Sequence, residues 1–131
     1  YEISECLVGS EMCIRDRYEA VSLDDFVEYS KSMFEYWTED DFASSFRKML
    51  TIEQFRSEEM QKLYQQYLVA GPASYVKALF ESIGIVNAKD KAARFYAVMH
   101  FYYSLYDGAA DKEKVKVEFV SAIKSLVQDL A

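Results

Sequence analysis

The residue types that most often carry chemistry are sparse in this chain. His100 is the only histidine, and the two cysteines, Cys6 and Cys13, both lie near the N-terminus. A zinc site needs several nitrogen or sulfur ligands, and a Ser-His-Asp arrangement cannot be argued from one histidine on a crowded aromatic segment. We therefore expect no metal site. We interpret His100 as a hydrogen-bonded core or interface residue rather than a ligand contact.

Carboxylates are the other candidates for chemistry, because two of them at the right separation can perform general acid and base catalysis. They occur in three clusters, Asp24-Asp25, Glu39-Asp40-Asp41 and Glu58-Glu59. Each cluster sits near an expected helix start, where negative charge is stabilising. No glycine-rich phosphate loop is present in the sequence. The sequence thus predicts a protein that is not an enzyme, with no catalytic residues and no cofactor.

Composition narrows the class of protein further. The chain has 131 residues, of which 51% are hydrophobic and 16% aromatic, with 4 glycines and 1 proline. This composition favours one compact helical domain. A net charge of -7 repels phosphate backbones, so the chain alone is not expected to bind nucleic acid. No apolar run approaches the roughly 20 residues of a membrane span. The cysteine-free sequence from Tyr18 onward fits a reducing, cytoplasmic setting.

Apolar residues recur at helical spacing from about residue 22 onward, without strand-like alternation. Ser22 and Thr38 are expected helix caps, and Thr51 with Gln54 forms a capping-box pattern that either starts a new helix or kinks the old one. Gly71-Pro72 is the one hard break. The expected helices cover about 23–37, 39–50, 52–68, 72–83, 89–106 and 112–130. We expect an all-α fold, a single helical domain of about six helices.

The helix expected over Ala92 to Tyr106 is apolar or aromatic nearly all the way round. A helix at the surface of a monomer needs only one apolar face. This helix is therefore expected to have one partner inside the subunit and one outside. The alternative is a central core helix surrounded by its own chain. One apolar stripe of this helix consists of Phe95, Met99, Tyr102 and Tyr106. The other stripe consists of Val98, Phe101 and Leu105.

The final helix also has a wide apolar face, so the last two helices can bury one side and offer the other to a second copy. A self-complementary patch of this kind predicts a two-fold symmetric four-helix bundle, and hence a homodimer. The candidate dimer contacts are Val98, Phe101, Leu105, Val120, Ile123 and Val127.

Aromatic residues also mark a candidate pocket for a small, mostly apolar molecule. Such a pocket needs apolar walls with a few polar tips, and buried tyrosine hydroxyls must find partners. For any one of these residues an ordinary core position is the alternative. The candidate ligand-binding residues are Phe34, Trp37, Phe46, Met49, Tyr64, Tyr67, Phe80, Tyr96, Met99 and Tyr103.

The stretch “FRKMLTIEQFRSEEMQKLYQQYLVAGPASYVKALFESIG”, residues 46–84, resembles the C-terminal domains of TetR/AcrR-type transcriptional regulators. The following “AARFYAVMHFYYSLYDG” is similar to that family's penultimate helix. The resemblance covers residues 18–131. It implies an effector-binding and dimerisation domain of a bacterial regulator, in which the last two long helices form the dimer bundle and the preceding helices enclose an apolar pocket.

The resemblance departs from the family at the N-terminus. Only 17 residues precede the matched region, and they contain no recognition-helix pattern, so operator DNA is expected to bind only through a missing N-terminal helix-turn-helix domain. Within them, “LVGSEMCIRDR”, Leu7 to Arg17, resembles the translation of a sequencing-library adapter. We expect residues 1–17 to be an artefactual or disordered segment, against the alternative of a genuine arm.

The alternative function for residues 18–131 is a helical protein–protein interaction module with no DNA-binding partner domain.

Overall fold

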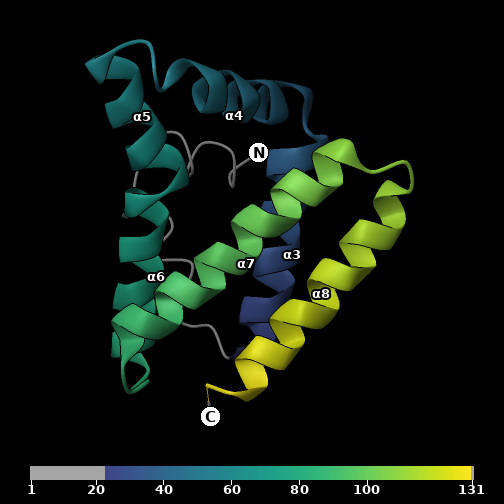
Figure 1. Ribbon diagram of the computed structural model, residues 1–131. Coiled ribbons are helices and arrows are strands. Elements are labelled where there is room, and N and C mark those ends of the chain that lie inside the picture. The colour runs from purple at the N-terminus through teal and green to yellow at the C-terminus, as the bar shows by residue number, and fades with distance from the viewer. Residues whose placement is uncertain (1–22, 131) are drawn as a thin grey trace.

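The computed structural model describes residues 23–130 (Figure 1). All regular secondary structure in this range is α-helical, which confirms the all-α prediction. The expected cap Ser22 and the segment of residues 1–17 lie outside the described residues. The helices are α3 (Leu23–Glu39), α4 (Asp41–Glu53), α5 (Glu58–Leu68), α6 (Ala70–Ser82), α7 (Ala88–Gly108) and α8 (Lys112–Gln128).

The start of α4 differs from the prediction. Thr38 stays within α3, where its hydroxyl donates to the Phe34 carbonyl oxygen at 2.7 Å. Asp40 is the N-cap instead, and its carboxylate accepts a hydrogen bond from the Ala43 N–H at 2.9 Å. A threonine hydroxyl can bond either forward as a cap or back by one turn, so the residue type alone does not fix the boundary.

The capping box predicted at Thr51 is also wrong. Thr51 lies in the last turn of α4, where its hydroxyl donates to the Arg47 carbonyl oxygen at 2.7 Å, and Gln54 is the C-cap. The next helix, α5, begins only after Ser57, whose hydroxyl accepts from the Met60 N–H at 3.1 Å. The expected helix over 52–68 is therefore interrupted by a turn between Gln54 and Ser57.

The central element of the fold is α7, which contacts α3, α6 and α8. Figure 1 shows α7 crossing in front of α3, with α8 running back beside it and α4 lying across one end. The core is aromatic where α3, α7 and α8 meet. The Phe34 ring stacks on Phe119 at 4.2 Å and on Tyr103 at 5.5 Å between ring centroids. This packing holds the interior face of α7 in place.

Candidate functional site

The interior face of α7 carries a row of hydrogen-bonding aromatic side chains, Tyr96, His100 and Tyr103, called the α7 row below. Their spacing of four and three residues places them on one side of the helix. The His100 ring packs edge-on against Tyr96 at 5.0 Å and against Tyr103 at 5.8 Å between centroids. Both tyrosines are buried and His100 is half-buried. The row is thus a polar feature within an aromatic core.

A bend between α5 and α6 explains why the carbonyl oxygen of Leu68 is free to bond His100. A regular helix would pair the Leu68 carbonyl with the N–H of residue 72, but Pro72 has no N–H. The backbone bonds on either side of this gap persist, at 3.2 Å from the Val69 N–H and at 3.1 Å from the Ala73 N–H. The Nε2 of His100 hydrogen-bonds the Leu68 oxygen instead. Because a carbonyl only accepts, Nε2 carries the proton.

Gly71 is the second requirement of this bend. A Cβ at Gly71 would lie 2.0 Å from the backbone oxygen of Gln66, far inside van der Waals contact. The joint residue Val69 has φ −131° and ψ −86°, outside the helical region. The Gly-Pro pair was expected to end one helix and start another at Pro72. Instead α6 begins at Ala70, so Pro72 lies in its first turn, where a missing N–H is tolerated.

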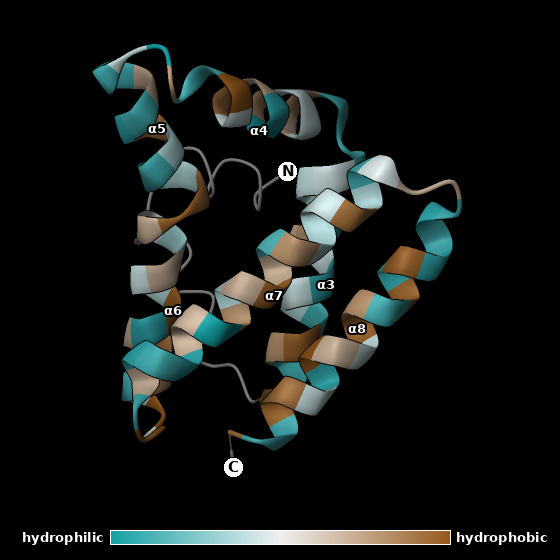
Figure 2. Cartoon of the chain, in the orientation of Figure 1, coloured by the Kyte–Doolittle hydropathy of each residue, from teal (hydrophilic) through white to brown (hydrophobic). Residues whose placement is uncertain are grey.

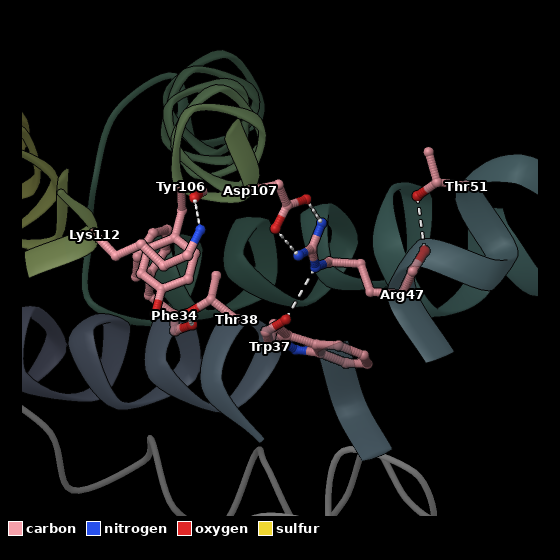
Figure 3. Close-up of polar contacts among 8 residues, drawn as sticks. All are labelled: Phe34, Trp37, Thr38, Arg47, Thr51, Tyr106, Asp107 and Lys112. Carbon is pink, nitrogen blue, oxygen red and sulfur yellow. Dashed lines mark hydrogen bonds and ion pairs between the residues drawn. The ribbon is translucent and has the colours of Figure 1, made fainter. Parts of the chain in front are cut away.

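Arg47 of α4 hydrogen-bonds residues of α3 and of the end of α7 (Figure 3). Its guanidinium forms a two-point fork with the Asp107 carboxylate at the end of α7, at 2.9 Å from Nη1 and 2.7 Å from Nη2. Its Nε donates to the Trp37 carbonyl oxygen at 3.0 Å. The guanidinium carbon also lies 5.0 Å from the centroid of the Tyr103 ring. Arg47 is only 6% exposed, so these contacts replace water around a buried charge.

Burial sets the protonation of the α7 row. It raises the pKa of Tyr96 well above the ordinary value, with smaller contributions from Tyr103 and Tyr64. Burial likewise raises the pKa of Tyr103, although Arg47 opposes this shift. Burial lowers the pKa of His100, the bond to Leu68 acts in the opposite direction, and Arg47 lowers it further. All three side chains are therefore uncharged near neutral pH. The row offers hydrogen bonds without fixed charge.

The ten predicted ligand-binding residues differ in burial, and their ring contacts fall in more than one part of the core. Phe80 packs at 5.5 Å from Phe26, which in turn packs at 4.9 Å from Phe95, in an aromatic group separate from the α7 row. Six of the ten are buried in the core: Phe34, Trp37, Phe80, Tyr96, Met99 and Tyr103. The other four are less buried and lie on α4 and α5, where the Phe46 and Tyr67 rings meet at 5.6 Å: Phe46, Met49, Tyr64 and Tyr67.

Sequence reasoning missed the polar contacts of the site. Arg47 follows Ala43 by four residues and precedes Leu50 by three, so it stands in the buried stripe of α4. That spacing was the available signal, because an arginine within an apolar stripe needs a buried partner. Its partner Asp107, 60 positions along the chain, could not be found from local pattern.

The outward face of α7 carries the three dimer contacts that were predicted on this helix. Phe101 is 58% exposed and Leu105 is 41% exposed, and Val98 is half-buried. The interpretation of α7 as a helix surrounded by its own chain is therefore wrong. On α8 the placement differs from the prediction, because Ile123 is 0% and Val127 8% exposed within the chain itself. Ile123 therefore offers no surface to a second copy, and Val127 offers very little.

The remaining predicted contact on α8, Val120, is half-buried. A groove of about 340 Å³ lies between the start of α7 and the end of α8, continuing the outward face. Ala122 and Leu126 from α8 take part in it, and the sequence prediction did not place them there. Its lining is Lys91, Arg94, Ala122, Ser125, Leu126, Asp129 and Leu130.

Metal sites and membrane spans are both absent from residues 23–130. In this range no group of three or more His, Cys, Asp or Glu side chains is arranged to hold a metal ion. None of the helices described has both the length and the apolar character needed to cross a membrane.

The chain matches no family model, no curated protein and no solved structure.

Proposed function

We propose that this chain is the effector-binding and dimerisation domain of a bacterial TetR-type transcriptional regulator, acting in the cytoplasm. In this proposal operator DNA binds through a separate N-terminal helix-turn-helix domain. The observation that best supports the proposal is that the two opposite faces of α7 have different surroundings. One face holds the uncharged α7 row inside the core, and the opposite face presents Phe101 and Leu105 to solvent.

Ligand sensing is supported by the chemistry of the interior face. The row combines aromatic walls with neutral hydrogen-bonding tips, which suits a small, mostly apolar effector with a few polar atoms. It lies between the α5–α6 bend, reached through the bond from His100 to Leu68, and the Arg47 fork on α4. An effector that moved the row would therefore act on both contacts, and through them on α3 and α4.

Dimerisation is supported by the exposed apolar face of the last two long helices. Large apolar side chains gathered on one surface of a monomer are typical of an interaction site. Val98, Phe101 and Leu105 recur three and four residues apart on α7, and α8 runs beside them with Ala122 and Leu126 half-buried. Two copies related by a two-fold axis would bury this face against itself.

Light scattering on the purified chain tests the dimer. We expect a dimer for the unchanged sequence and a monomer for Phe101→Glu, since a charge at that contact would be buried and unpaired. Val117→Glu is the matched control, because Val117 is 68% exposed on α8 and is not a candidate contact. It should remain a dimer. A chain that stays monomeric at high micromolar concentration would contradict the proposal.

Fluorescence of Trp37, the only tryptophan, tests ligand sensing. Trp37 is 3% exposed and its carbonyl accepts from Arg47, so movement of the Arg47 fork should change its emission. We expect some members of a panel of small amphipathic molecules to shift this signal and to raise the melting temperature. Tyr103→Phe should weaken the response. A dimer that responds to no member of a broad panel would instead favour the helical interaction module.

A further inference from the structure

A second apolar surface lies on α4, at the end of the molecule where that helix packs on α3 and α5. Figure 2 shows hydrophobic residues on α4. Three large apolar side chains of α4 are exposed, Phe42 by 63%, Met49 by 38% and Ile52 by 69%, and Phe55 in the turn that follows is exposed by 83%. Together with the half-buried Phe46, these residues are called the α4 surface below.

The α4 surface has the geometry of a continuous stripe. Phe42, Phe46 and Met49 recur four and three residues apart, so they follow one side of the helix. The rings of Phe42 and Phe46 lie parallel with centroids 5.8 Å apart, and Phe46 meets Tyr67 of α5 at 5.6 Å. The stripe therefore extends from α4 toward α5 rather than ending as isolated side chains.

The buried anchors of α4 lie apart from the exposed part of this stripe. The buried residues of α4 are Ala43, Arg47 and Leu50. They anchor the helix through core packing and the fork on Asp107. The exposed side chains Phe42, Met49 and Ile52 are not among these buried anchors, whereas Phe46 packs partly against the core. Contiguous apolar area of this kind on a monomer is typical of a binding surface.

The charges around the stripe indicate what covers it. Five carboxylates stand at its two ends, against three exposed cations, Lys48, Arg56 and Lys62. Arg56 is already engaged with one of these carboxylates, Glu53, at 3.2 Å. Four of these acidic residues also stabilise the starts of α4 and α5, and Glu53 lies in the last turn of α4, but the field that the five leave over the stripe is negative. The five are Asp40, Asp41, Glu53, Glu58 and Glu59.

We infer that the α4 surface docks a basic amphipathic helix from another polypeptide. A linear apolar stripe along a helix and its neighbour accepts the apolar face of a third helix. The acidic ends select lysine and arginine on that helix and repel an anionic lipid surface. The surface is separate from the outward face of α7, so the inference stands whether or not the chain dimerises through α7 and α8.

A synthetic helix of about 18 residues, with leucine on one face and lysine on the other, is the probe. Its affinity is measured by fluorescence anisotropy, and its contacts by amide chemical-shift changes. We expect binding that weakens with added salt and shifts concentrated in α4 and the start of α5. The same peptide with glutamate in place of lysine should bind at least about tenfold more weakly.

Paired variants localise the site. Ile52→Ser and Val117→Ser remove side chains of similar shape that are 69% and 68% exposed, the first on α4 and the second on α8. The double variant Phe42→Ser/Ile52→Ser should lose at least about tenfold in affinity, with Val117→Ser unchanged. Because these residues are exposed, all the variants should fold. Circular dichroism checks this.

Four results would overturn the inference. The lysine peptide could bind all variants equally, or the glutamate peptide could bind as tightly as the lysine peptide. Alternatively, Phe42→Ser/Ile52→Ser could reduce the size of the chain's own oligomer in light scattering. This last result would assign the α4 surface to a second copy of the chain. Equal binding of the unchanged chain to anionic lipid vesicles and to the peptide would also contradict the charge argument.

Discussion

His100 supplies Leu68 with a hydrogen bond that the backbone cannot. Leu68 lies at the end of α5 and is 1% exposed. In a continuous helix its carbonyl would accept a hydrogen bond from the N–H four residues later, but that residue is a proline and has no N–H. The imidazole, 32 positions along the chain, occupies that role from α7. The bend in α5–α6 and the orientation of the α7 row are therefore parts of one arrangement.

Replacing His100 with phenylalanine tests this bond. The ring would fill a similar volume, but the buried Leu68 carbonyl would lose its donor, which typically costs about 1–3 kcal/mol. We expect urea unfolding of His100→Phe to show a loss of that size. His100→Gln keeps an amide donor and should lose less. Equal stability of His100→Phe and the unchanged chain would show that water can satisfy Leu68.

The protonation of His100 predicts a dependence of stability on pH. Its pKa in the folded chain is lowered by burial and by Arg47, against the bond to Leu68. Below about pH 6.5, the ordinary pKa of histidine, the unfolded state therefore binds more protons than the folded state. Stability should fall as the pH falls from there toward the folded pKa.

Thermal melts between pH 7.5 and pH 5 measure this effect. Acidic groups also titrate toward the lower end of this range, so the contribution of His100 is the difference from His100→Gln, which lacks the titrating ring. We expect the unchanged chain to lose more stability over this range than the variant. Parallel pH profiles would show that His100 has the same pKa folded and unfolded.

The helices could be predicted from the sequence because the patterns that indicate them are local. Apolar spacing and the glycine at position 84, which has φ +82°, were enough to predict long helices and one of their ends. The misplaced caps at Thr38 and Thr51 show where local signals are ambiguous. A hydroxyl can bond forward to an N–H or back to a carbonyl, and the surrounding packing decides between them.

The candidate site was harder to predict because it depends on contacts between residues that are far apart in the sequence. The α7 row contains two residues that aromatic content already suggested, Tyr96 and Tyr103. The contacts of His100 with Leu68, and of Arg47 with Asp107, join positions 32 and 60 apart. No periodic pattern encodes them. On α8, Ile123 and Val127 were assigned outward because a wide apolar face does not reveal which side meets its own core.

The Arg47–Asp107 fork should be worth more than an exposed ion pair, since the Arg47 side chain is only 7% exposed. Asp107→Asn removes the charge that compensates it. Because the Asp107 side chain is 30% exposed, water moderates the loss, and we expect about 1.5–3 kcal/mol in urea unfolding. Arg47→Lys keeps the charge but cannot form the fork and reach the Trp37 carbonyl together, so it should also be destabilised.

A double-mutant cycle separates the pair from other effects of each change. Arg47→Met and Asp107→Asn are measured singly and together. The double variant should lose clearly less than the two single losses combined, because the second change removes a partner that is already lost. Fully additive losses would show that the fork contributes no coupling and that Arg47 acts only through Trp37 and Tyr103.

Two glycines make a matched test of the α5–α6 bend. In Gly71→Ala the new Cβ would meet the backbone oxygen of Gln66 at 2.0 Å, whereas in Gly108→Ala no atom lies within 4 Å of it. A backbone atom cannot rotate away as a side chain does. Gly71→Ala should therefore lose more than about 1 kcal/mol, while Gly108→Ala should be neutral or gain about 0.4–1 kcal/mol by restricting the unfolded chain.

Urea unfolding compares the two variants, and hydrogen exchange at Val69 and Ala73 reports the bend directly. Those two amides donate the backbone bonds on either side of the gap at Leu68, at 3.2 and 3.1 Å. Gly71→Ala should speed their exchange, because relieving the clash requires the joint to open. Gly108→Ala should leave their exchange unchanged. Equal stability and equal exchange in both variants would mean that α5–α6 can bend without Gly71, leaving Pro72 and His100 as its sole determinants.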